Sequence, residues 1–129
     1  MANVDKDNIL LDRSFAFAVR VVKLRKFLLY EVPFKEHDIS KQLVRSASSV
    51  GANVEEAQGA QSDSDFLSKM SIAYKEARES RYWVRLLSAT DYLSPEAANS
   101  LLSDIDELCR ILSKIIIKTK LRIKNKNQQ

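Results

Sequence analysis

The stretch FLSKMSIAYKEARESRYWVRLL, residues 66–87, decides the fold of this chain. Small or apolar residues recur in it at alternating steps of four and three residues: Phe66, Met70, Ala73, Ala77, Ser80, Val84 and Leu87. This spacing places the residues along one side of a helix, so the pattern predicts a helix with a coiled-coil-like seam. A seam of this kind is buried only when other helices pack against it.

Glycine and proline are scarce, and their positions divide the rest of the chain into further helices. The sequence has two of each: Pro33, Gly51, Gly59 and Pro95. Because both residue types disfavour helix interiors, Pro33, Gly59 and Pro95 mark connections, whereas Gly51 falls inside a helical stretch. Helices are predicted over about residues 7–32, 38–58, 64–90 and 95–124. The short connections make neighbouring helices antiparallel, which predicts an all-α, up-down-up-down four-helix bundle in a single domain spanning residues 1–129.

Residue types at the helix ends agree with these boundaries. The expected caps are Asp38 at the start and Gly59 at the end of the second helix, Ser62 or Ser64 at the start of the third, and Ser94 before Pro95 in the fourth.

The predicted first helix carries two adjacent apolar stripes, whereas a surface helix needs only one. One stripe consists of Leu10, Phe17, Val21, Leu24 and Leu28, and the other of Leu11, Phe15, Ala18, Val22 and Leu29. Two stripes predict burial on two sides, one within the subunit and one against another subunit.

The short connection between the second and third helices predicts which of their residues lie level. If the turn centres near residues 61–62, Ala47 lies near Glu76 and Ala77, and Gly51 lies near Ile72 and Ala73. Because small residues let helix backbones approach each other, we expect close packing of Ala47 with Ala77 and of Gly51 with Ala73.

Larger side chains on these two helices predict further contacts. The same level-matching brings Arg45 within one turn of Glu76 and Glu79, which predicts an interhelical ion pair. Tyr82 and Trp83 form an aromatic pair that could be a binding platform. Such pairs more often anchor a core or an oligomer interface, and the two-stripe first helix favours the interface.

Composition limits the classes of protein to consider. The chain has 129 residues and a net charge of +4, and it contains no apolar run near the roughly 20 residues that a membrane span needs. Its polar, acidic start does not resemble a secretory signal. A single cysteine, Cys109, rules out an internal disulfide and fits the reducing cytoplasm, and its place on an apolar stripe is typical of a core residue.

Four glutamates are the candidates for a carboxylate metal site: Glu55, Glu56, Glu76 and Glu79. Di-iron bundles also need histidine from two helices, and the only histidine, His37, lies in the first connection. The glutamates are therefore interpreted as solvated or ion-paired acids. No activated nucleophile or convergent acid–base set is evident, so we expect no metal, no cofactor and no enzymatic activity.

Basic residues gather at the C-terminal end. Residues 108–129 contain no acidic residue and the following basic ones: Arg110, Lys114, Lys118, Lys120, Arg122, Lys124 and Lys126. Lysine and arginine bind phosphates, so this end predicts a nucleic-acid surface. Its predicted members are Lys114, Lys118, Lys120, Arg122 and Lys124, joined by Arg20 and Lys23 of the first helix. The alternative is a solvated helix end that favours solubility.

Two motif-bearing stretches carry a resemblance to a known family. They are LVRSASSVGANVEEA, residues 43–57, and IAYKEARESRYW, residues 72–83. The chain resembles the bacterial four-helix-bundle proteins encoded in 23S rRNA intervening sequences. The hallmark pairs of that family are matched at Arg45-Ser46, Ser49-Val50, Ala52-Asn53 and Glu56-Ala57, with Ala57 standing where the family usually has glycine.

The resemblance implies a bundle fold and assembly into a homopentamer. It also implies kinship with the accessory variability determinant of diversity-generating retroelements, a pentameric barrel that binds nucleic acid and a reverse transcriptase. Residues expected to serve helix packing or an interface are Arg45, Ala47, Gly51, Asn53, Ala73, Glu76, Ala77, Glu79, Tyr82 and Trp83. We expect a cytoplasmic, non-enzymatic homo-oligomeric scaffold that binds RNA or a ribosome-associated protein. The alternative is a purely structural protein–protein module.

Overall fold

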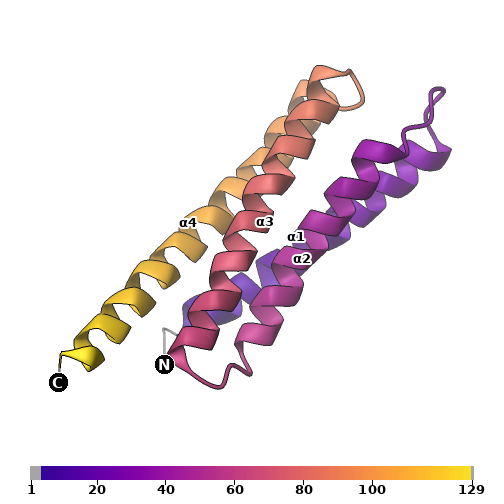
Figure 1. The fold of residues 1–129 in the computed structure, drawn as a ribbon. Coiled ribbons are helices and arrows are strands. Elements are labelled where there is room, and N and C mark those ends of the chain that lie inside the picture. Colours follow the sequence, from indigo (N-terminus) through magenta and orange to yellow (C-terminus); the bar gives the residue numbers. More distant parts are fainter. Residues whose placement is uncertain (1–3, 129) are drawn as a thin grey trace.

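The computed structural model describes residues 4–128, with side chains from Ile9 onward, and this part of the chain forms four helices. They are α1 (Val4–Tyr30), α2 (Asp38–Ala57), α3 (Asp63–Ala89) and α4 (Pro95–Asn127). Each helix packs against the next, and α1 also packs against α4, which closes the ring and leaves α1 and α3 diagonal to each other (Figure 1). The prediction of an all-α, up-down-up-down four-helix bundle is confirmed.

The helix boundaries differ most from the predicted ones at both ends of α1 and at the end of α4. Helix α1 begins at Val4 instead of residue 7. Helix α1 ends at Tyr30 instead of residue 32, because the residue before Pro33 disfavours helical angles and the Lys35 ammonium caps the Tyr30 carbonyl at 2.9 Å. Helix α4 continues to Asn127 instead of residue 124, since no glycine or proline interrupts it and its last lysines suit the negative end of the helix dipole.

The start of α2 is capped by a residue other than the predicted Asp38. Asp38 is the first residue of the helix, and His37 at the N-cap position makes no side-chain cap bond. The buried Glu36 carboxylate takes that role, accepting hydrogen bonds from the backbone N–H of Ile39 at 2.9 Å and of Ser40 at 2.6 Å. The longer glutamate side chain reaches these free N–H groups from one residue further back.

The structure also shows which residues cap the ends of the other helices. Ser62, not Ser64, caps α3 by accepting from the Asp65 N–H at 3.0 Å. Ser94 caps α4 as predicted, accepting from the Ala97 N–H at 3.2 Å. Gly59 is not the C-cap of α2, which is Gln58, and no described glycine has a positive φ.

The turn that follows α3 contains a left-handed residue that is not glycine. Asp91 has φ of 68°, and the N–H of Tyr92 bonds to the Leu87 carbonyl at 2.9 Å while the N–H of Asp91 bonds to Ser88 at 3.1 Å. These two bonds form a Schellman motif, which satisfies the last carbonyls of the helix.

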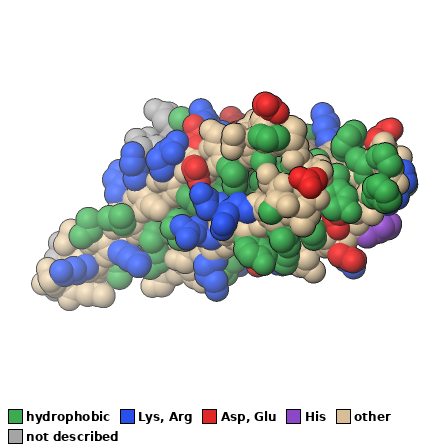
Figure 2. Space-filling model, turned by 90° about the horizontal axis from the view of Figure 1, so that it is seen from above, with side chains coloured by type: hydrophobic (Ala, Val, Ile, Leu, Met, Phe, Trp, Pro, Cys, Tyr) green, Lys and Arg blue, Asp and Glu red, His purple; other side chains and the backbone are tan. Residues whose placement is uncertain are grey.

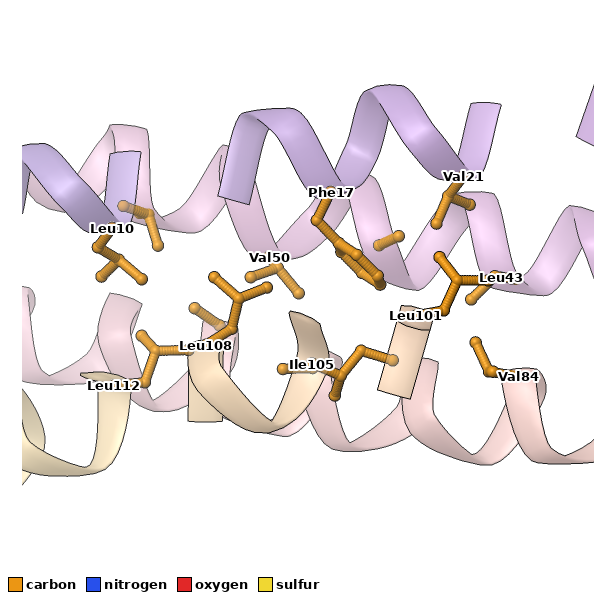
Figure 3. Close-up of a cluster of buried hydrophobic side chains, with 14 of the residues drawn as sticks. Leu10, Phe17, Val21, Leu43, Val50, Val84, Leu101, Ile105, Leu108 and Leu112 are labelled. Atoms are coloured by element: carbon orange, nitrogen blue, oxygen red, sulfur yellow. The ribbon is translucent and has the colours of Figure 1, made fainter. Parts of the chain in front are cut away.

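The core runs along the length of the bundle. Side chains from all four helices point toward one another in it, including Phe17 of α1, Val50 of α2, Val84 of α3 and Ile105 of α4 (Figure 3). Each of these side chains is at most 1% exposed, and burying one contributes roughly 1.5–3 kcal/mol.

Small residues of α2 and α3 are buried in the bundle, but Gly51 does not pack against α3 as predicted. Ala47, Ala73 and Ala77 are each fully buried. Gly51 instead faces α1, where a Cβ at this position would lie 3.5 Å from the carbonyl oxygen of Ser14. The predicted pairing of Gly51 with Ala73 is therefore wrong. Counting residues from the turn gives the height of a residue along its helix, but it does not give the direction in which the residue points.

Candidate nucleic-acid interface

The last turns of α4 carry lysines in two rows. Lys114 and Lys118 form one row and Lys120 and Lys124 the other; all four are exposed, and none has an ion-pair partner among the described side chains. At steps of four residues, each row follows one line along the helix. The projecting end of α4, at the left of Figure 2, shows lysine, arginine and hydrophobic side chains and no acidic one.

Two apolar residues lie between these rows. Ile117 is 58% exposed and Leu121 is 54% exposed, and they are themselves four residues apart. The outer face of this end of α4 is therefore basic on both sides and apolar in the middle.

Arg122 serves a structural role that was not predicted. Its Nη2 and the Nζ of Lys126 bind the Asp63 carboxylate at 3.1 and 2.7 Å, which ties the end of α4 to the start of α3. The hydrogen bond from Lys126, followed by the one from Arg122, holds the pKa of the Asp63 carboxyl below its usual value. Arg122 therefore differs from the four lysines in having its charge compensated by a carboxylate.

The two predicted basic residues of α1 also differ from each other. Arg20 forms an ion pair with Asp104 and donates a hydrogen bond to Ser100 at 3.1 Å, so it joins α1 to α4. Lys23 is exposed, and no described carboxylate pairs with it. The sequence did not reveal the Arg20 contact, since no short loop relates α1 to α4.

A cluster of polar side chains joins α2 to α3, as predicted. Arg45 binds Glu76 at 3.3 Å and also binds Glu79, which confirms the expected interhelical ion pair. The indole N–H of Trp83 donates to the same Glu79 carboxylate at 2.9 Å. This hydrogen bond, with Arg45 as the second favourable partner, holds the pKa of Glu79 below its usual value. Since these charges are partly exposed, solvent screens each pair, and the pairs contribute little to the stability of the fold.

The remaining predicted packing residues occupy different environments. Trp83 is half-buried and packs against the core, whereas Tyr82 is 54% exposed. Their rings meet edge-on, with centroids 5.0 Å apart and planes at 75°. Asn53 bonds within its own helix, donating to the Ser49 carbonyl at 2.9 Å, and makes no described hydrogen bond to another helix.

The second stripe of α1 is largely exposed. Phe15 is 72% exposed and Val22 is 42% exposed, and Val19, which the predicted stripe did not include, is 36% exposed. Leu11, Ala18 and Leu29 of the same stripe are half-buried. An apolar strip of α1 thus faces outward.

The remaining side chains to consider are those that could act in catalysis or bind a metal. Burial raises the pKa of the Cys109 thiol, which disfavours the reactive thiolate. His37 lies in the α1–α2 connection. Among the described side chains, no group of three or more His, Cys, Asp and Glu is placed to hold a metal ion. Over residues 4–128, no helix has an apolar stretch long enough to cross a membrane.

Comparison with known proteins adds a family and a related structure. The model of the 23S rRNA-intervening sequence protein family matches residues 6–114. A crystal structure of a protein of unknown function from the S23 ribosomal protein family of Bacteroides thetaiotaomicron is 48% identical in sequence. Its TM-score is 0.83, and the match covers 86% of this chain and 97% of that one. No curated protein matches the sequence.

Proposed function

The chain belongs to the 23S rRNA-intervening sequence protein family, and from this premise we propose that it is a cytosolic, non-enzymatic homo-oligomeric scaffold that binds RNA. The observation that carries the proposal is the basic end of α4. Every acidic residue of the chain lies before residue 108. Residues 115–129 lie outside the segment matched by the family model, so this part of the proposal rests on the side chains of the chain itself.

The exposed lysines of α4 suit an RNA backbone. None of their ammonium groups pairs with a carboxylate among the side chains that the structure describes, so binding a phosphate displaces counterions without breaking a described ion pair. Because each row extends along the helix, Lys114 and Lys118 can contact one stretch of backbone while Lys120 and Lys124 contact another. Such contacts bind RNA largely without regard to its sequence.

Assembly would repeat this surface. The exposed strip around Phe15, Val19 and Val22 supplies apolar area for contact with another copy, and the expected assembly is a homopentamer. A ring of copies displays several basic ends at once, and simultaneous contacts with one RNA strengthen binding through effective concentration.

The RNA proposal is tested by fluorescence anisotropy with a labelled single-stranded RNA at low salt. The variant Lys118→Gln/Lys124→Gln should bind on the order of tenfold more weakly than the wild type. The control Lys35→Gln/Lys41→Gln changes the net charge equally at the opposite end of the bundle and should bind as the wild type does. Equal affinity of all three proteins, or no binding by the wild type, contradicts the proposal.

The assembly is tested separately by light scattering. The wild type should have the mass of a homopentamer, and Phe15→Glu should reduce it to a monomer because a charge would be buried against the partner copy. Phe34→Glu, at a residue 82% exposed in the α1–α2 connection, should leave the assembly intact. A monomeric wild type contradicts this part of the proposal. An oligomer that binds no RNA at low salt indicates the protein–protein module instead.

A further inference from the structure

A second basic surface lies on the outer face of α3, diagonal to α1. Lys75, Arg78, Tyr82 and Arg85 are spaced so that they lie on one side of the helix, and all four are exposed. No described carboxylate forms an ion pair with Lys75, Arg78 or Arg85. An assembly through α1 would leave this face accessible, because α1 and α3 lie diagonally across the bundle and this face points away from the core.

The acidic residues near this surface are already engaged. Glu76 and Glu79 belong to α3 but bind Arg45 of α2. Asp106 of α4 binds Arg81 at 3.4 Å. The three remaining basic side chains, Lys75, Arg78 and Arg85, therefore have no ion-pair partner over residues 9–128.

Tyr82 provides an aromatic surface among these charges. Its ring is positioned edge-on against Trp83, whose indole is in turn held by the Glu79 carboxylate. A shallow depression of about 160 Å³ is lined by Tyr82, Arg85, Leu86 and Ala89. The depression thus combines an aromatic ring, a guanidinium group and apolar side chains.

We propose that Tyr82 stacks on an unpaired base of single-stranded RNA, with the Arg85 guanidinium beside the same base. Lys75 and Arg78, closer to the start of α3, contact the phosphates. Aromatic rings and arginine planes are the usual stacking partners of splayed RNA bases, whereas bases within a duplex are already stacked. The inference rests on the proposed function, since it assumes that the chain binds RNA, and it adds the form of RNA and a base contact.

The α3 surface is connected to the basic end of α4. Lys75 of α3 and Lys120 of α4 line the same groove, of about 320 Å³, whose wall includes Tyr74 and Ile116. A single strand that leaves Tyr82 along α3 passes Arg78 and Lys75 and reaches Lys120 across this groove, whose walls between the two lysines are largely apolar.

The experiment compares two labelled probes of equal length and charge, an oligouridine RNA and an abasic ribose-phosphate oligomer. Tyr82→Ala should bind oligouridine about 5- to 100-fold more weakly than the wild type and should bind the abasic probe equally well. Tyr82→Phe keeps the ring and should retain the affinity. The control Tyr30→Ala removes another tyrosine, 72% exposed at the end of α1, and should bind both probes as the wild type does.

The outcomes separate this inference from the proposed function. If Lys118→Gln/Lys124→Gln weakens RNA binding but Tyr82→Ala does not, only the stacking site is wrong. Equal weakening of both probes by Tyr82→Ala also overturns it, because the ring would then act without a base. If Tyr82→Ala changes the mass in light scattering and leaves RNA affinity unchanged, the residue belongs to a protein interface. A wild type that binds neither probe overturns both proposals.

Discussion

Replacing Gly51 tests the contact between α1 and α2 with two substitutions, one expected to stabilise the fold and one expected to destabilise it. Glycine inside a helix costs about 0.5–1 kcal/mol relative to alanine. The Cβ of Gly51→Ala would lie 3.5 Å from the Ser14 carbonyl oxygen and 3.7 Å from the Ser14 hydroxyl oxygen, which are ordinary van der Waals contacts. Gly51→Ala should therefore stabilise the fold by about 0.5–1 kcal/mol.

A leucine at the same position should have the opposite effect. Its side chain extends beyond Cβ toward the α1 backbone at Ser14, which cannot move aside as a flexible side chain can. Overpacking of this kind costs about 1–3 kcal/mol. The control Ala52→Leu adds leucine at the next residue, which is exposed, and should change stability by less than about 0.5 kcal/mol.

Urea unfolding at a fixed protein concentration measures all three variants. If the slope m is unchanged, the shift of the midpoint multiplied by m gives the change in the free energy of unfolding. The reasoning is refuted if Gly51→Ala destabilises the protein by more than 1 kcal/mol, since α1 would then lie closer than the structure shows. It is also refuted if Gly51→Leu is no less stable than the wild type.

Three further predictions concern other parts of the bundle. Glu79 has a folded-state pKa below its usual value of 4.5, so its contribution to stability is complete above 4.5 and is lost as the pH falls from there through the folded-state pKa. The stability difference between wild type and Glu79→Gln, measured by urea unfolding, should therefore shrink from pH 7 to pH 3. The buried hydroxyls of Ser46 and Ser80 lie 2.8 Å apart, so each single alanine variant should cost about 1 kcal/mol and the double variant less than their sum; additive costs in this double-mutant cycle would rule out the coupling. Asp91 has φ of 68°, so Asp91→Gly should stabilise by up to about 1 kcal/mol, and a lower thermal midpoint would contradict this.

The fold was predictable because the local signals agree with one another. The Ser94-Pro95 start of α4 and the seam of α3 indicate helices of definite length, and short connections leave antiparallel packing as the solution. The direction in which Gly51 points was not predictable in this way. It lies one residue past buried Val50, about 100° further around the helix, and therefore faces α1.

Contacts between distant segments were the least predictable part of the candidate surfaces. Arg45 and its glutamates were found because one short turn relates α2 to α3. The binding of Arg20 by Asp104 depends on the relative position of α1 and α4, which no short loop joins. The binding of Arg122 by Asp63 lies at the far end of α3 and α4 from the short connection between them, where small differences in helix direction decide which side chains meet. The cap at Glu36 was missed because short polar residues are the usual N-caps, whereas this glutamate is buried and reaches back over the first turn.

The salt dependence of RNA affinity tests most directly the claim that the basic end of α4 binds RNA phosphates. The logarithm of the association constant for a single-stranded RNA is plotted against the logarithm of the salt concentration for wild type and Lys118→Gln/Lys124→Gln. Each lost phosphate contact should reduce the slope by about 0.7, so the variant should have a slope shallower by about 1.4. Equal slopes for the two proteins, or an affinity that does not change with salt, would contradict the account.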